Sequence, residues 1–61
     1  MTTKEINDTL REACRRGDIK AWSQPVYGAI WYIQPLTGET RQMDWKMAHD
    51  FASMLEEANA A

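Results

Sequence analysis

The chain has 61 residues, of which 44% are apolar and 26% charged, and its formal charge is −2. This length predicts one domain over residues 1–61, burying about 60% of its extended surface. A single cysteine and a single histidine exclude an intramolecular disulfide and a zinc site built from these two residue types. The longest apolar run, residues 29–33, is far shorter than the roughly 20 residues of a membrane-spanning helix, so we expect a soluble cytoplasmic protein.

Residues 2–16 form the first predicted helix. Thr2 and Glu5 have the spacing of a capping box, in which each side chain satisfies a free backbone N–H. Apolar residues recur at positions 6, 10, 13 and 14 and form one narrow stripe. Arg15 and Arg16 suit the negative end of the helix dipole, and Gly17 can end the helix in a left-handed conformation.

The middle of the chain, residues 19–43, is predicted to be a small β-sheet. Strand-forming residues such as Val26, Tyr27 and Trp31 alternate with turn-forming proline and glycine. The segment PLTGE reads as a hairpin turn with Gly38 in the left-handed region. A first strand at residues 19–23 would make a three-stranded meander, and without it the sheet is a single hairpin.

The turn also predicts which side chains lie opposite each other. Its length places Trp31 opposite Met43, Tyr32 opposite Gln42 and Ile33 opposite Arg41. Because side chains alternate across a sheet, Trp31, Ile33 and Met43 share the face that packs on the helices. We expect the other face, with Tyr32 and with Ile30 at its end, to be partly open.

A second helix is predicted after Asp44, which is a good N-cap residue. Its apolar residues are Met47, Ala48, Phe51, Ala52, Met54, Leu55 and Ala58. This stripe is wider than that of the first helix, which predicts a more central position for the second. The sequence therefore predicts an α+β fold, in which both helices pack on one face of the sheet.

Catalytic chemistry is not expected. Cys14 lies on the apolar stripe of the first helix, whereas His49 lies on the polar side of the second, so the two would not share a pocket. No other combination of residues suggests a nucleophile, a metal site or a cofactor site. We expect neither enzymatic activity nor a bound cofactor or metal.

The outer side of the second helix is acidic and is the candidate contact surface. Asp50, Glu56 and Glu57 could dock on a basic protein surface, although a merely solvated helix face is the alternative. Tyr32 and Trp45 add aromatic side chains, which are favoured at protein contacts. These five residues are the predicted partner-binding site of a monomer or weak homodimer.

Two other functions remain open. Arg15, Arg16 and Lys20, with Trp22 nearby, could contact phosphates and stack on bases, although Asp8 and Glu12 are spaced to neutralise part of the helical charge. The open sheet face could instead pair with its own copy in a structural assembly.

The whole chain, with two helices framing an aromatic hairpin, an acidic last helix and no catalytic set, resembles small phage or mobile-element proteins of the anti-CRISPR type in size and character. The resemblance rests on no shared motif. It implies a non-enzymatic inhibitor that binds a component of a larger nucleic-acid-processing complex of the host. It assigns no residue a role.

Overall fold

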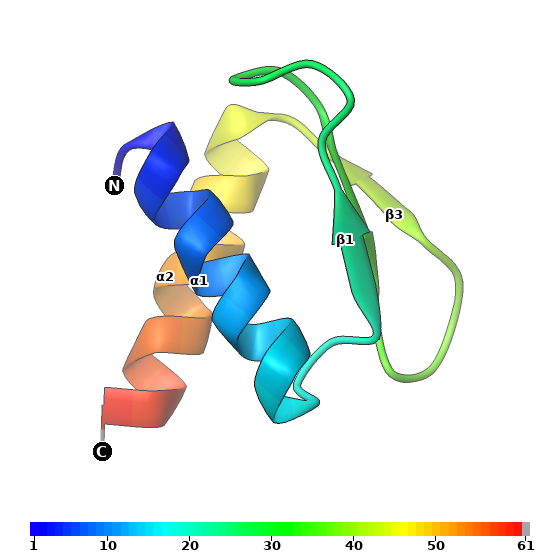
Figure 1. Ribbon diagram of the computed structural model, residues 1–61, viewed down its shortest axis with the longest axis vertical. Helices are drawn as coiled ribbons and strands as arrows, with labels where there is room; N and C mark the ends of the chain where they lie inside the picture. Colours follow the sequence, from blue (N-terminus) through cyan, green and yellow to red (C-terminus); the bar gives the residue numbers. More distant parts are fainter. Residues whose placement is uncertain (61) are drawn as a thin grey trace.

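The structure is a computed structural model that describes residues 1–60. Its elements are α1 (Thr3–Arg16), β1 (Ala21–Ser23), β2 (Trp31–Gln34), β3 (Arg41–Met43) and α2 (Trp45–Ala60). The strands form one antiparallel sheet in the order β1-β2-β3. Both helices lie on the same side of this sheet, and its other side is open (Figure 1). The predicted α+β fold is confirmed in its three-stranded form.

Helix α1 begins and ends as its sequence predicts. The backbone N–H of Glu5 donates to Thr2 Oγ1 at 3.2 Å, and the backbone N–H of Thr2 donates to Glu5 Oε1 at 2.9 Å. Gly17 ends the helix with a φ of 86°, a conformation that a side chain would strain. Both ends of α1 are therefore fixed by local sequence.

The sheet has the predicted register. Trp31 pairs with Met43, Tyr32 with Gln42, and Ile33 with Arg41. Strand β1 begins at residue 21 rather than 19, and the preceding Ile19 belongs to the core. The predicted alternation is confirmed, because Trp31, Ile33 and Met43 are buried whereas Tyr32 and Gln42 are exposed.

The core lies between α1 and the sheet, with the indole of Trp31 fully buried at its centre. Helix α1 buries Ile6, Leu10 and Ala13, but α2 buries only Ala48 and Ala52. The prediction that α2 lies more centrally is therefore wrong. Only two small residues of α2 are fully buried, with Phe51 and Leu55 partly buried beside them. The three short strands offer too little surface to cover the rest of its apolar side.

A chain of amide hydrogen bonds runs through the edge of the core. The indole nitrogen of Trp31 donates to Asn7 Oδ1 at 2.7 Å, and Asn7 Nδ2 donates to Gln24 Oε1 at 2.9 Å. The side-chain nitrogen of Gln24, Nε2, is buried and has no acceptor within residues 1–60. This network ties α1 to β2 and to the loop after β1.

Candidate functional site

The open face of the sheet carries one aromatic side chain among small and polar ones. Tyr32 lies in the central strand, directly across from Ser23 on one side and Gln42 on the other. All three are exposed. The structure thus places Tyr32 where a partner could reach it.

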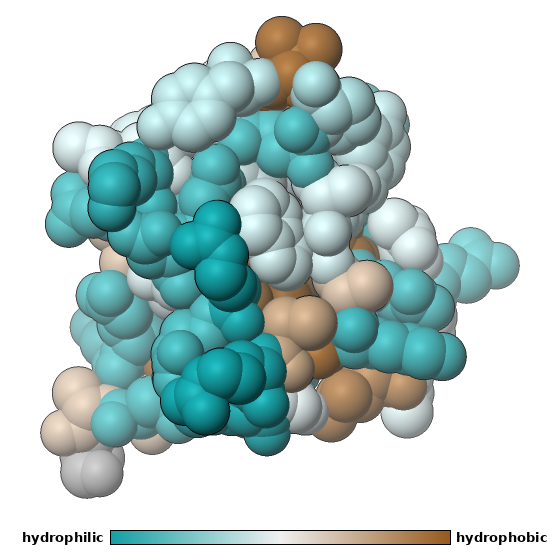
Figure 2. Space-filling view, viewed as in Figure 1, coloured by the Kyte–Doolittle hydropathy of each residue, from teal (hydrophilic) through white to brown (hydrophobic). Residues whose placement is uncertain are grey.

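The loop of residues 24–30 lies beyond the end of the sheet and carries further exposed apolar residues (Figure 1). Val26 and Tyr27 are 66% and 70% exposed, more than any other large apolar residue. They were predicted as strand formers, but Gly28, with a φ of 82°, lies in a turn that carries them out of the sheet. Figure 2 shows a strongly hydrophobic side chain projecting above this loop at the top of the molecule. A shallow pocket of about 200 Å³ beside it is lined by Pro25, Val26, Ala29, Ile30 and Tyr32.

The structure separates the acidic residues that were predicted to act together. Asp50 Oδ2 accepts a hydrogen bond of 3.1 Å from the Lys46 ammonium, which holds the pKa of the Asp50 carboxyl below its ordinary value. Glu57 is exposed and forms no ion pair within the described chain. Asp50 and Glu57 remain on the outer side of α2, as predicted.

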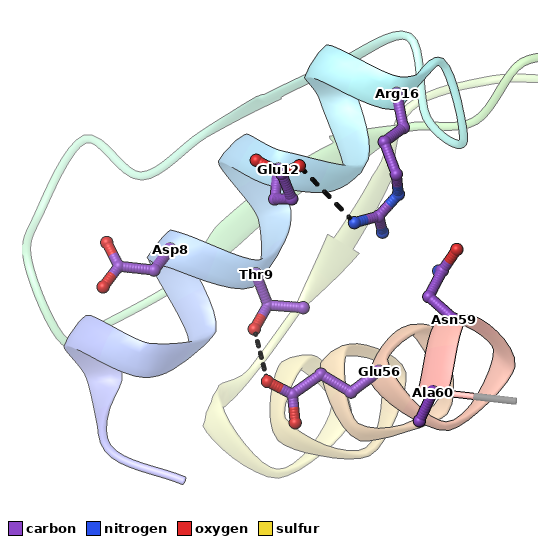
Figure 3. A pocket seen from close by; sticks show the side chains of 7 residues that line it. All are labelled: Asp8, Thr9, Glu12, Arg16, Glu56, Asn59 and Ala60. Carbon is purple, nitrogen blue, oxygen red and sulfur yellow. Dashed lines mark hydrogen bonds and ion pairs between the residues drawn. The ribbon is translucent and has the colours of Figure 1, made fainter.

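Glu56 instead lies against α1. Its Oε1 accepts a hydrogen bond of 3.2 Å from the buried Thr9 hydroxyl, and Figure 3 shows these two side chains pointing toward each other across the helices. The groove around this contact has a volume of about 420 Å³. It is lined by Asp8, Thr9, Glu12, Arg16, Glu56, Asn59 and Ala60. Glu56 is exposed, but it lies on the side of α2 that faces α1, apart from Asp50 and Glu57.

Trp45 and His49 lie on a third side of α2, next to each other. Their rings stack with centroids 5.0 Å apart at an interplanar angle of 26°.

Cys14 lies in α1 and does not contact His49. Its thiol donates a hydrogen bond of 3.5 Å to the backbone carbonyl of Lys20. Among residues 1–60, no three His, Cys, Asp or Glu side chains come together as possible metal ligands.

Sequence reasoning missed a further surface, because it assigned the methionines of α2 to the core. Met47 and Met54 are 51% and 57% exposed, and Phe51 between them is only partly buried. Around the helix, at about 100° per residue, they lie between the outer acidic residues and the core strip of Ala48. The exposed side of α2 is thus apolar as well as acidic.

The basic residues of α1 are largely neutralised. Arg11 forms an ion pair with Asp8, Arg15 with Glu12, and Arg16 with both Glu12 and Asp18. The Arg15 guanidinium beside Glu12 also keeps the pKa of that carboxyl below its ordinary value. These pairs lower the positive potential that a phosphate backbone would meet.

Trp22, the aromatic residue of the predicted nucleic-acid site, is oriented toward the core. It pairs with Ile33 in the sheet and packs against the buried cluster. Its ring is therefore not presented on the open sheet face together with Tyr32.

Comparison with protein-family models, with curated proteins and with solved structures gave no match. Within residues 1–60, neither helix combines the length and the apolar character that crossing a bilayer requires.

Proposed function

We propose that this chain is a non-enzymatic protein-binding domain that inhibits a larger complex. The observation that carries the proposal is the exposure of large apolar side chains on two surfaces. One comprises Val26, Tyr27 and Tyr32 at the open end of the sheet, and the other comprises Met47 and Met54 on α2. In small proteins, gathered apolar side chains of this kind commonly mark interaction sites.

The placement of the reactive side chains supports a binding role rather than catalysis. The Cys14 thiol is bound to a backbone carbonyl, and the His49 ring stacks on Trp45. A nucleophile and its base must lie within hydrogen-bond reach of each other or of one substrate. The Cys14 thiol and the His49 ring do not contact each other.

The charge of α2 supports a more specific form of the proposal. From Asp44 onward the chain has four carboxylates and one lysine, so this segment carries −3 while the whole chain carries −2. Such a surface suits a partner with a basic surface, as in a nucleic-acid-processing complex of the host. An inhibitor of the anti-CRISPR type has this character.

Capture from cells tests the proposal. The tagged chain should retain one protein at a fixed ratio after nuclease digestion and a wash at about 150 mM salt. A matched variant with Arg15→Gln and Arg16→Gln should retain the same protein, because these side chains are engaged within α1.

The opposite pattern would replace the proposal with the nucleic-acid module. In that case the captured material would disappear on nuclease digestion, and the purified chain would bind short DNA or RNA with an affinity that falls steeply with salt. The Arg15→Gln and Arg16→Gln variant would then lose its ligand.

A further inference from the structure

Four residues of α2 form an apolar stripe that the fold covers only in part, namely Met47, Phe51, Met54 and Ala58, which we call the methionine face. Phe51 is partly buried, and the other three are exposed. Their spacing of four, three and four residues is that of the a and d positions by which one helix packs on another. Methionine side chains adapt to irregular partner surfaces and are common where helices are bound. The spacing and the residue types suit a helical partner.

A groove beside the methionine face could receive a side chain of that partner. It lies between α2 and the hairpin that joins β2 to β3, and its volume is about 320 Å³. Phe51 belongs both to this groove and to the methionine face, and Ile33 and Met43 supply further apolar lining. Thr37, Glu39 and Arg41 form the polar part of the groove lining, and the charges of Glu39 and Arg41 are opposite. A helix lying along α2 would therefore pass the mouth of a preformed groove with an apolar floor at Phe51.

Negative charge borders the methionine face on the side away from the sheet. Asp50 comes three residues after Met47, and Glu57 comes three residues after Met54. Each carboxylate therefore lies next to a methionine on the helix surface. Lys46 pairs with Asp50 only, and it is itself highly exposed. A partner helix with lysine or arginine beside its apolar residues would complement this border.

The same charges disfavour a second copy of the chain as the occupant. In an antiparallel pair of α2 helices, the Asp50 and Glu57 borders of the two copies would face each other. In a parallel pair, the acidic border of one copy would meet the Leu55 side of the other, and Leu55 already packs against the core of its own chain. The only positive charge that α2 brings to the border is Lys46, which already pairs with Asp50 of its own chain.

We infer that the methionine face binds a basic amphipathic helix of the partner protein, with one of its apolar side chains entering the groove at Phe51. The inference rests on the proposed function, because it names the partner chemistry for the same binding role. It assigns Tyr32 and the loop of residues 24–30 no part in this contact.

Two synthetic peptides of 18 residues test the inference directly. Both carry leucine at the a and d positions, but one has lysine and the other glutamate at the flanking positions. The chain contains only four methionines, so a methyl-labelled sample gives four signals, with Met1 as an internal control. We expect the lysine peptide to shift the signals of Met43, Met47 and Met54 but not that of Met1, and to bind at least tenfold more tightly than the glutamate peptide.

Two variants and one matched control sharpen the test. Met47→Ser with Met54→Ser should lower the affinity for the lysine peptide more than tenfold. Asp50→Lys with Glu57→Lys should make the chain prefer the glutamate peptide to the lysine peptide. Val26→Ser with Tyr27→Ser removes apolar residues from the other exposed surface and should leave both affinities unchanged. An unshifted Met43 signal in each free variant verifies that the core is intact.

The inference is overturned if neither peptide binds below millimolar concentration, if both bind equally, or if the lysine peptide binds without shifting the signals of Met47 and Met54. Sedimentation that shows a dimer, lost in the Met47→Ser and Met54→Ser variant, would also overturn it by making a second copy the occupant. The proposed function fails separately, when no protein partner is retained in cells. The proposed function holds without this inference if the partner still binds the Met47→Ser and Met54→Ser variant but no longer binds the Val26→Ser and Tyr27→Ser variant.

Discussion

The indole nitrogen of Trp31 donates a hydrogen bond of 2.7 Å to the side-chain oxygen of Asn7, which joins the centre of the sheet to the first turns of α1. Trp31 is fully buried, so its N–H has no access to water. A buried donor without a partner destabilises a fold, and Asn7 prevents this. The same asparagine also donates to Gln24, so one side chain positions three segments.

Replacing Asn7 should therefore destabilise the protein in a way that depends on the new side chain. Asn7→Leu leaves the Trp31 indole unpaired and should lower the free energy of unfolding by about 1–3 kcal/mol. Asn7→Asp keeps an oxygen that accepts from the indole. If the side-chain amide of Gln24 rotates by half a turn, its Nε2, which has no partner in the native chain, can donate to the second oxygen of the new carboxylate. We expect the aspartate variant to lose less stability in urea unfolding, and equal losses would contradict this role of Asn7.

Stability should fall in acid because several carboxyl groups have a lower pKa in the folded chain. A backbone N–H of Thr2 lowers the pKa of Glu5 below its ordinary value of 4.5, and the Lys4 ammonium lowers that of Asp8 below 3.8. The unfolded chain therefore binds more protons, so the stabilisation is complete above about pH 5 and is lost as the pH falls through these values. Urea midpoints from pH 7 to pH 2.5 should decline below pH 5. Midpoints that stay constant or rise would contradict this.

Two alanines of α2 provide a matched pair that tests how the helix packs. Ala52 is fully buried at the contact strip, whereas Ala58 is exposed on the methionine face. Ala52→Leu should force the helix away from the core and lower the free energy of unfolding by about 1–3 kcal/mol. Ala58→Leu should change it by no more than about 0.5 kcal/mol. Thermal unfolding of both variants measures the difference, and similar losses would mean that α2 packs more deeply than described.

The biological activity should not depend on the two reactive side chains. Cys14→Ala together with His49→Ala removes the only thiol and the only imidazole of the sequence. Since neither lies on the methionine face, we expect the double variant to bind its partner with unchanged affinity. Loss of activity in a variant whose circular dichroism shows the native fold would indicate a chemical role for one of them.

Local signals predicted most of the fold. The capping box at Thr2, the glycine at position 17 and the turn at Gly38 each determine backbone geometry within a few residues, so the helix ends and the hairpin register followed from sequence. The sheet faces then followed from alternation alone.

Tertiary relationships could not be predicted in the same way. The spacing of Met47 and Met54 fits a buried helix side, and only the small area of the sheet leaves them outside. Glu56 fits an outer acidic side, and only the approach of α1 turns it toward Thr9. The bond between Asn7 and Trp31 joins residues 24 positions apart and has no local signal.

Photo-crosslinking in cells tests the central claim, that the methionine face is the partner-binding surface, most directly. A photoreactive amino acid in place of Met54 should join one segment of one protein, with lysine or arginine on either side of its apolar residues. The same amino acid in place of Val26, which is exposed in the loop before β2, should give no cross-link to that protein. Cross-links from position 26 without any from position 54 would contradict the claim and assign binding to the open end of the sheet.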